Sequence, residues 1–190
     1  NNSLQNASSS VMTSKFHGDL QDLRLIPMSS TEIAMAYAVG CWLRGLIVAT
    51  SIFFISQVFF YFVHGGLLLP KHWVSFFFFL SIGCLIFGNI GIWAGFISNT
   101  FDQISAITNF IVLPLIYLGG VFFPLSGLSG FWNAVAHANP LVYLIQGLRW
   151  SVLEVSDLPM GLCVGLSLVF LVISGGLAWR AVKFGSYQRF

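Results

Sequence analysis

Two long stretches of this 190-residue chain contain no charged side chain, and they constrain its fold more than any other feature. Residues 72–101 and residues 103–148 lack Asp, Glu, Lys and Arg entirely. Charged residues make up 7% of the chain, whereas soluble domains carry about 25%. This small number of charged residues cannot cover a water-facing surface. We therefore expect lipid to be the solvent of this chain.

Four apolar stretches are long enough to cross a hydrocarbon layer of about 30 Å, which takes roughly 20 helical residues. They are residues 39–63, 73–97, 104–123 and 161–179. A membrane barrel strand would alternate apolar and polar residues over about ten positions, and these stretches do not alternate. The sequence therefore predicts an all-α, polytopic membrane protein with four transmembrane helices.

The basic residues lie mostly outside the predicted spans and suggest an orientation. The first span is preceded by, or begins with, Lys15, Arg24 and Arg44, and the last is followed by Arg180, Lys183 and Arg189. Four crossings put both ends on one side, and the excess of basic residues makes that side cytoplasmic. The net charge of +2 is too small and scattered to indicate nucleic acid as a partner.

Residues 13–26, before the first span, have the pattern of a short amphipathic helix. Phe16, Leu20 and Leu23 recur at i, i+4 and i+7 on one side, and the opposite side would carry Lys15, Asp19 and Asp22. Such a helix either rests on the membrane interface or docks on a partner protein, and the pattern alone leaves both open.

Pro27 ends that segment, and a second helix is predicted to start directly after it. Ser29 and Glu32 have capping-box spacing, and Met28 and Ile33 are placed as a hydrophobic staple. A helix from residue 30 to residue 63 would measure about 50 Å. Its first turns must therefore protrude from the hydrocarbon layer.

The region 124–160 is apolar but interrupted by helix breakers, among them Gly127 and Gly130. Asn139 is a good N-cap residue, and Pro140 suits the first position of a helix. Pro140–Leu153 is too short to cross a membrane. With residues 131–137 it suggests a pair of short re-entrant or interfacial helices on the outer side.

Pro114 lies inside the third predicted span and cannot donate to the carbonyl of Phe110. Gly119 and Gly120 follow it. We expect a kink or a close helix contact there, although each of these residues is also compatible with ordinary membrane packing.

Several motifs together resemble the type-2 ABC exporter permeases, in particular the small bacterial export permeases. The resemblance rests first on the run Leu113-Pro114-Leu115-Ile116-Tyr117-Leu118-Gly119-Gly120-Val121-Phe122-Phe123-Pro124, then on Asn139-Pro140-Leu141-Val142-Tyr143 and Gly147-Leu148-Arg149. It continues upstream through residues 16–25, Pro27, Glu32-Ile33, Tyr37 and Arg44-Gly45. It therefore covers nearly the whole chain, as a single transmembrane permease domain over residues 1–190.

The resemblance implies a six-span protein whose first two spans are absent here, with residues 1–12 as the inner end of the second span. It implies that residues 15–25 form the coupling helix that sits on an ABC ATPase subunit. The coupling residues would be Phe16, Asp19, Leu20, Asp22, Leu23, Leu25 and Pro27. The motif residues of structural importance would be Arg44, Pro114, Gly119, Gly120, Pro124, Asn139, Pro140, Tyr143 and Arg149.

The same resemblance implies two permease copies and two ATPase subunits in the bacterial cytoplasmic (inner) membrane. The chain contains no G-x-x-x-x-G-K-[ST] phosphate-binding motif. We therefore expect no cofactor on this chain, with ATP and magnesium bound by the partner, and no enzyme activity of its own. The expected function is export of an amphipathic, lipid-linked or hydrophobic compound.

Two alternatives remain open from the residues. A membrane enzyme acting on lipid or glycan at the outer face would use Glu154, Asp157 and His137, although these acids also fit solvated loop charges near Arg149. A purely structural membrane subunit would have no transport role. The other histidines and the three cysteines have no metal-ligand spacing.

Arg44 has two interpretations as well. Its side chain either extends to the lipid headgroups or pairs with an acid on the inner side, such as Glu32 or Asp102.

Overall fold

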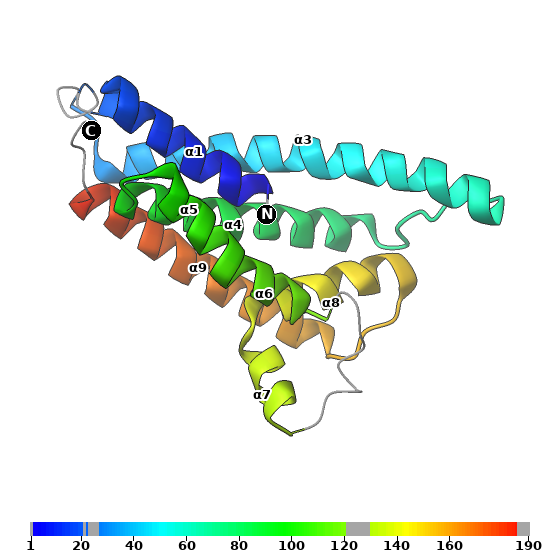
Figure 1. Cartoon of the computed structure of the whole chain (residues 1–190). Coiled ribbons are helices and arrows are strands. Elements are labelled where there is room, and N and C mark those ends of the chain that lie inside the picture. The colour runs from blue at the N-terminus through cyan, green and yellow to red at the C-terminus, as the bar shows by residue number, and fades with distance from the viewer. Residues whose placement is uncertain (1, 21, 23–26, 121–129, 186–190) are drawn as a thin grey trace. The chain divides into compact units, whose positions relative to one another are not determined.

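The structure is a computed structural model that describes residues 2–20, 22, 27–120 and 130–185 (Figure 1). Every regular element in these residues is helical, which confirms the all-α prediction. The helices are α1 (Asn2–His17), α3 (Ser30–His64), α4 (Trp73–Ile97), α5 (Phe101–Ile107), the π-helix η1 (Thr108–Val112), α6 (Leu113–Tyr117), α7 (Gly130–Ala138), α8 (Pro140–Leu153) and α9 (Met160–Phe184).

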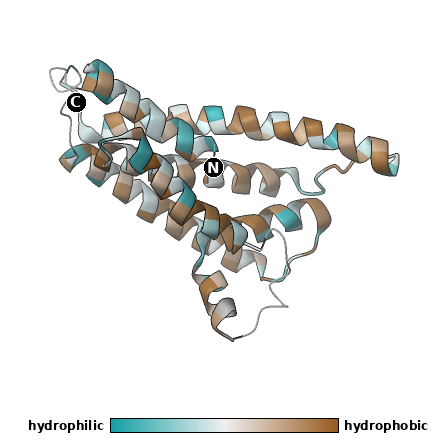
Figure 2. Cartoon of the chain, viewed as in Figure 1, coloured by the Kyte–Doolittle hydropathy of each residue, from teal (hydrophilic) through white to brown (hydrophobic). Residues whose placement is uncertain are grey.

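Three of these helices are long and apolar enough to cross a membrane. They are α3 with 35 residues and α4 and α9 with 25 residues each, and Figure 2 shows hydrophobic residues along all three. Their exposed side chains include Phe62, Val74 and Val172, which are 81%, 87% and 74% accessible. Apolar surface of this extent on one helix after another fits lipid rather than water.

The fourth predicted span, residues 104–123, overlaps the helical run Phe101–Tyr117, which is apolar but shorter than the other three. Residues 121–123 lie outside the described part of the chain. The count of four spans therefore stays a prediction.

Pro114 follows a π-turn instead of interrupting a regular α-helix. The N–H of Leu113 donates to the carbonyl of Thr108, five residues earlier. The regular pattern resumes when Leu118 N–H donates to the Pro114 carbonyl at 2.9 Å. A π-turn is one of the ways in which a helix accommodates a residue that cannot donate, so the expected irregularity is present in this form.

The chain divides into two compact units, described here one at a time. Unit 1 consists of Asn1–Gly45, Cys84–Leu113 and Leu171–Phe190, and unit 2 of Leu46–Gly83 and Pro114–Phe170. The core of unit 1 is built by side chains from α1, α3, α4 and α9, namely Ala7, Val11, Leu20, Ile33, Ala34, Cys41, Ile92, Phe96, Ala178, Ala181 and Val182.

Within unit 1, α1 packs closely against α4 because two glycines face it. A Cβ at Gly91 would collide with the Leu4 carbonyl, and a Cβ at Gly95 would lie 2.8 Å from the Val11 Cβ. These glycines form a G-x-x-x-G pattern, which lets helix backbones approach in membrane proteins. This glycine spacing is visible in the sequence and could have predicted the contact.

Within unit 2, α8 packs on α4 through another glycine. A Cβ at Gly147 would enter the ring of Phe79, which is 1% accessible. Ala136 of α7 and Val142 of α8 form a small buried cluster with Leu158 packed against it. The predicted helix Pro140–Leu153 is confirmed, and α7 includes the predicted residues 131–137.

Candidate functional site

The predicted amphipathic helix over residues 13–26 is interrupted at Gly18. Helix α1 ends at His17, and Gly18 has φ +89° with its N–H bonded to the Ser14 carbonyl at 3.1 Å. A left-handed glycine of this kind is a common helix stop. Helical residues resume at Asp19 and Leu20, so Phe16 and Leu20 do not share one helix, and the expectation of a single helix was wrong.

The described apolar residues of this segment, Phe16 and Leu20, differ in exposure. Leu20 is fully buried in the core of unit 1. Phe16 is 39% accessible and stacks on Phe101 with ring centroids 5.5 Å apart. Asp19, Asp22 and Pro27 are exposed, whereas Leu23 and Leu25 lie outside the described residues. The accessible side chains among the described residues of this segment therefore include the acids Asp19 and Asp22.

Lys15 is buried, although it was expected on the solvent side. Its ammonium donates to the carbonyls of Phe96 at 2.7 Å and Ser98 at 2.8 Å. These carbonyls lie at the C-terminal end of α4, where the helix dipole favours a cation. Lys15 continues the buried stripe of α1, which also contains Leu4, Val11 and Met12, and this spacing was the signal that could have placed it. Lys15 therefore fastens the end of α1 to the end of α4.

Helix α3 starts with the predicted capping box. The Ser29 N–H donates to Glu32 Oε2 at 2.7 Å, and the Glu32 N–H donates to Ser29 Oγ at 3.2 Å. This arrangement satisfies two donors at the start of the helix. The Glu32 carboxylate is thereby engaged in the cap of its own helix.

Arg44 donates from Nη1 to the Ser10 hydroxyl at 3.2 Å. The ion pairs found among the described residues do not include Arg44, so the expected partner Glu32 or Asp102 is not confirmed. The side chain is exposed on α3, and its contact with lipid headgroups stays a prediction.

Asn139 has both a capping and a bridging role in unit 2. Its side chain accepts from the Leu141 N–H at 3.0 Å, as predicted for the cap of α8, and Pro140 takes the first helical position. Its Nδ2 donates to the Leu115 carbonyl of α6 at 2.7 Å. Gly119 also lies against α8, since a Cβ there would be 2.9 Å from Ile145 Cδ1.

Tyr143 and Arg149, the other motif residues on α8, bind backbone carbonyls. The Tyr143 hydroxyl donates to the His137 carbonyl at 2.6 Å. Arg149 Nη2 donates to the carbonyl of Gly120 at 2.9 Å, and Gly120 has φ +75°. Pro124 lies outside the described residues. The described motif residues of α8 thus connect it to the segments on either side.

The acids of this region are held by neighbouring groups. Asp157 lies 3.7 Å from Arg149 Nη1 and accepts from Gln146 Nε2 at 3.0 Å. Glu154 forms an ion pair with Lys71 at 2.7 Å, and this hydrogen bond lowers the pKa of the Glu154 carboxyl. No group of three or more metal-ligating side chains occurs in the described part of the chain. The arrangement is that of a structural network.

Comparison with known proteins gives a consistent result. A family model described as "ABC-2 type transporter" matches residues 1–153. The chain is 34% identical over 185 residues to the "Inner membrane transport permease YadH" of Escherichia coli strain K12, covering 97% of this chain and 70% of that protein. The Shigella flexneri protein of the same name matches equally. No solved structure matches the chain significantly.

Proposed function

The chain belongs to the ABC-2 type transporter family, and from that premise we propose that it is the transmembrane subunit of an ATP-driven exporter. Membership makes it a multi-pass transport subunit of the inner membrane rather than a catalytic enzyme, and it implies an ATPase partner. The observation that supports the proposal most is the extent of the match, which includes α1, the segment after Gly18 and the outer helices α7 and α8.

Coupling to the ATPase is assigned to the segment that begins at Gly18. Lys15 holds the preceding helix to the C-terminal end of α4, while Asp19 and Asp22 remain exposed. A segment that is anchored on one side and accessible on the other can pass a displacement into the helices. ATP and magnesium are bound by the partner subunit in this account, and a second copy of the permease completes a homodimer surrounded by membrane lipid.

The proposed topology keeps four crossings, with the run Phe101–Tyr117 and the residues after it as the third. Both ends then lie in the cytoplasm, the side favoured by the basic residues. The short helices α7 and α8 belong to an outer re-entrant region.

The proposed cargo is amphipathic, lipid-linked or hydrophobic. The residues 72–101 and 103–148 offer no charged side chain for an ion or proton pathway. The alternative of a lipid-modifying enzyme is not favoured, because Glu154 and Asp157 are already engaged by Lys71 and Arg149.

The direction of transport is tested with membrane vesicles. The complete gene product and its ATPase are expressed together, and a short-chain fluorescent phospholipid serves as the probe. Export predicts ATP-dependent movement of the probe to the inner leaflet of inside-out vesicles. ATP-dependent movement only in the opposite direction would contradict the proposal.

A further inference from the structure

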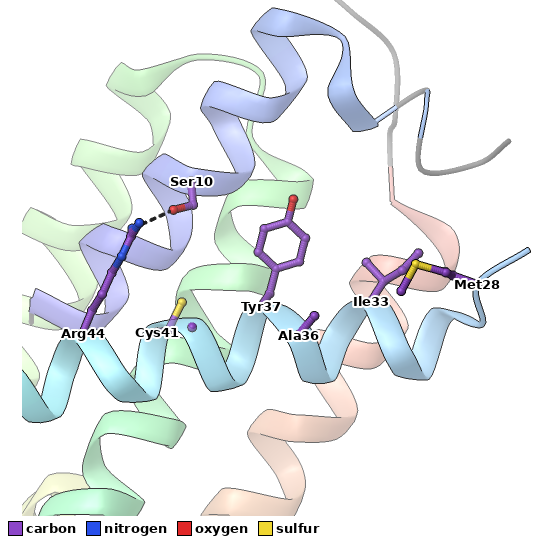
Figure 3. A pocket seen from close by; sticks show the side chains of 8 residues that line it. Ser10, Met28, Ile33, Ala36, Tyr37, Cys41 and Arg44 are labelled. Atoms are coloured by element: carbon purple, nitrogen blue, oxygen red, sulfur yellow. Dashed lines mark hydrogen bonds between the residues drawn. The ribbon is translucent and has the colours of Figure 1, made fainter. Parts of the chain in front are cut away.

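A pocket of about 340 Å³ lies in unit 1 between α1 and the first half of α3 (Figure 3). Its volume is within the range of about 300–1,000 Å³ typical of small-molecule pockets. The lining residues are Ser10, Met28, Ile33, Ala36, Tyr37, Gly40, Cys41 and Arg44. Polar groups are provided by Arg44, Ser10 and Tyr37, and most of the remaining lining is apolar.

The pocket has one cationic group and no anionic one. Arg44 uses one of its five N–H donors on Ser10, and none of the lining residues is Asp or Glu. Planar guanidinium groups bind phosphate oxygens well. An anionic phosphate fits this lining, whereas a headgroup with a positive amine would find no carboxylate.

Arg44 also lies at a depth where lipid phosphates occur. Residues 45–64 contain no Asp, Glu, Lys or Arg, and as a helix they rise about 30 Å, the thickness of the hydrocarbon layer. Helical side chains lean toward the helix N-terminus, which places the Arg44 guanidinium over the turn of Gly40 and Cys41. Arg44 is therefore at the boundary of the hydrocarbon, with the pocket on the headgroup side.

The space above Gly40 is open. A Cβ at Gly40 would meet no atom within 4 Å, so a larger side chain there would fill the pocket without displacing the backbone. Ser10 on α1 and Tyr37 on α3 line the same pocket as Gly40, and the Ser10 hydroxyl is directed at Arg44 (Figure 3). A small hydroxylated headgroup such as glycerol would find both an aromatic and a polar surface.

We propose that this pocket binds an anionic phospholipid of the phosphatidylglycerol type, with its phosphate on Arg44 and Ser10, its glycerol headgroup against Tyr37 and Gly40, and its acyl chains in the hydrocarbon layer. The lipid would bridge α1 and α3. The site is independent of the transport cycle and is tested without it.

The test is a lipid titration of the complete gene product in neutral detergent, with bound lipids counted by native mass spectrometry. Phosphatidylglycerol should bind at least tenfold more tightly than phosphatidylcholine. Arg44→Gln should weaken phosphatidylglycerol binding by about tenfold, because it removes a charge-assisted contact, and Arg44→Lys should restore part of it. Gly40→Leu should weaken it similarly by filling the pocket.

Matched controls are available on α9. Arg180→Gln removes an exposed charge, and Gly176→Leu adds a side chain at another glycine with open space around it. Both should bind phosphatidylglycerol as the wild type does. Equal weakening by Arg44→Gln and Arg180→Gln would overturn the proposal, as would undiminished binding to Gly40→Leu.

Two further results would also overturn it. Displacement of the lipid by soluble glycerol phosphate at comparable concentration would indicate a free-phosphate site. Loss of the homodimer in Gly40→Leu, with lipid binding unchanged, would show that a second copy of the chain occupies the pocket.

Discussion

At the residue scale, Lys15 is the buried charge with the clearest structural role. Its ammonium has two carbonyl acceptors at the end of α4 and no solvent exposure. A buried charge is tolerated only where its hydrogen bonds are satisfied. Lys15 therefore fixes the end of α1 against the end of α4 and contributes to the stability of unit 1.

Replacement of Lys15 by Met should destabilise the protein by about 1–3 kcal/mol, because the carbonyls of Phe96 and Ser98 lose their donor inside the core. The measurement is the free energy of unfolding in mixed micelles. Lys71→Met is the control, since that exposed side chain pairs with Glu154 at the surface, where such pairs contribute little to stability. Equal losses in the two variants would refute the anchoring role of Lys15.

The Lys71–Glu154 pair should respond to acid. Lys71 lowers the pKa of the Glu154 carboxyl, so the pair is intact above the ordinary glutamate pKa and is lost as the pH falls through the lowered value. Amide-exchange protection of residues 65–72 should therefore decrease on acidification, after correction for intrinsic exchange rates. Glu154→Gln should show reduced protection already at neutral pH. If Glu154→Gln and the wild type lose the same amount of protection on acidification, the Lys71–Glu154 pair is not the cause of the pH response.

At the element scale, small residues and a helix cap connect several of the described helices. Gly91 and Gly95 bring α1 onto α4, and Asn139 connects the start of α8 to α6. Each of these contacts leads to a testable prediction.

Gly95→Leu should separate α1 from α4 and cost about 1–3 kcal/mol, the usual effect of overpacking. The side chain would collide with Val11. Gly176→Leu on α9 is the matched control, because its side chain would meet no neighbouring atom. Thermal unfolding of the purified protein checks the prediction, and a Gly95→Leu midpoint equal to that of the control would contradict the close approach.

Variants of Asn139 can separate its capping role from its bridging role. Asn139→Ser keeps an acceptor for the Leu141 N–H but removes the Nδ2 donor to the Leu115 carbonyl, whereas Asn139→Ala removes both. Since a lost cap and a lost hydrogen bond each cost about 1 kcal/mol, Asn139→Ala should destabilise the protein more than Asn139→Ser, which loses the bridge alone. Chemical denaturation gives the ranking, and an Ala variant as stable as the wild type would rule out both roles.

The sequence predicted the elements whose signals are local. Hydrophobic length predicted α4 at its observed bounds, and Asn139 with Pro140 predicted the start of α8. It failed at Gly18, where residues with helical spacing are divided by a left-handed glycine, and at Lys15 and Leu20, whose burial depends on contacts with distant helices. The pairing of Arg149 with the Gly120 carbonyl is likewise tertiary and had no local signal.

At the scale of the whole molecule, the family match and the apolar helices both indicate a membrane transport protein. Three long apolar helices accompany a permease relative that is 34% identical. Membership of the ABC-2 type transporter family implies an ATPase partner. The exposed acids after Gly18 are the proposed contact with that partner, and charge reversal there leaves the buried Leu20 in place.

The most direct test of this account is co-purification of the complete gene product with its ATPase from gently solubilised membranes. We expect stoichiometric recovery of the ATPase with the wild type and with the control Lys183→Glu, and its loss with Asp19→Lys combined with Asp22→Lys in a protein that remains folded. Recovery of a dimeric permease without any ATPase, or with undiminished ATPase in the charge-reversal variant, would contradict the proposed coupling.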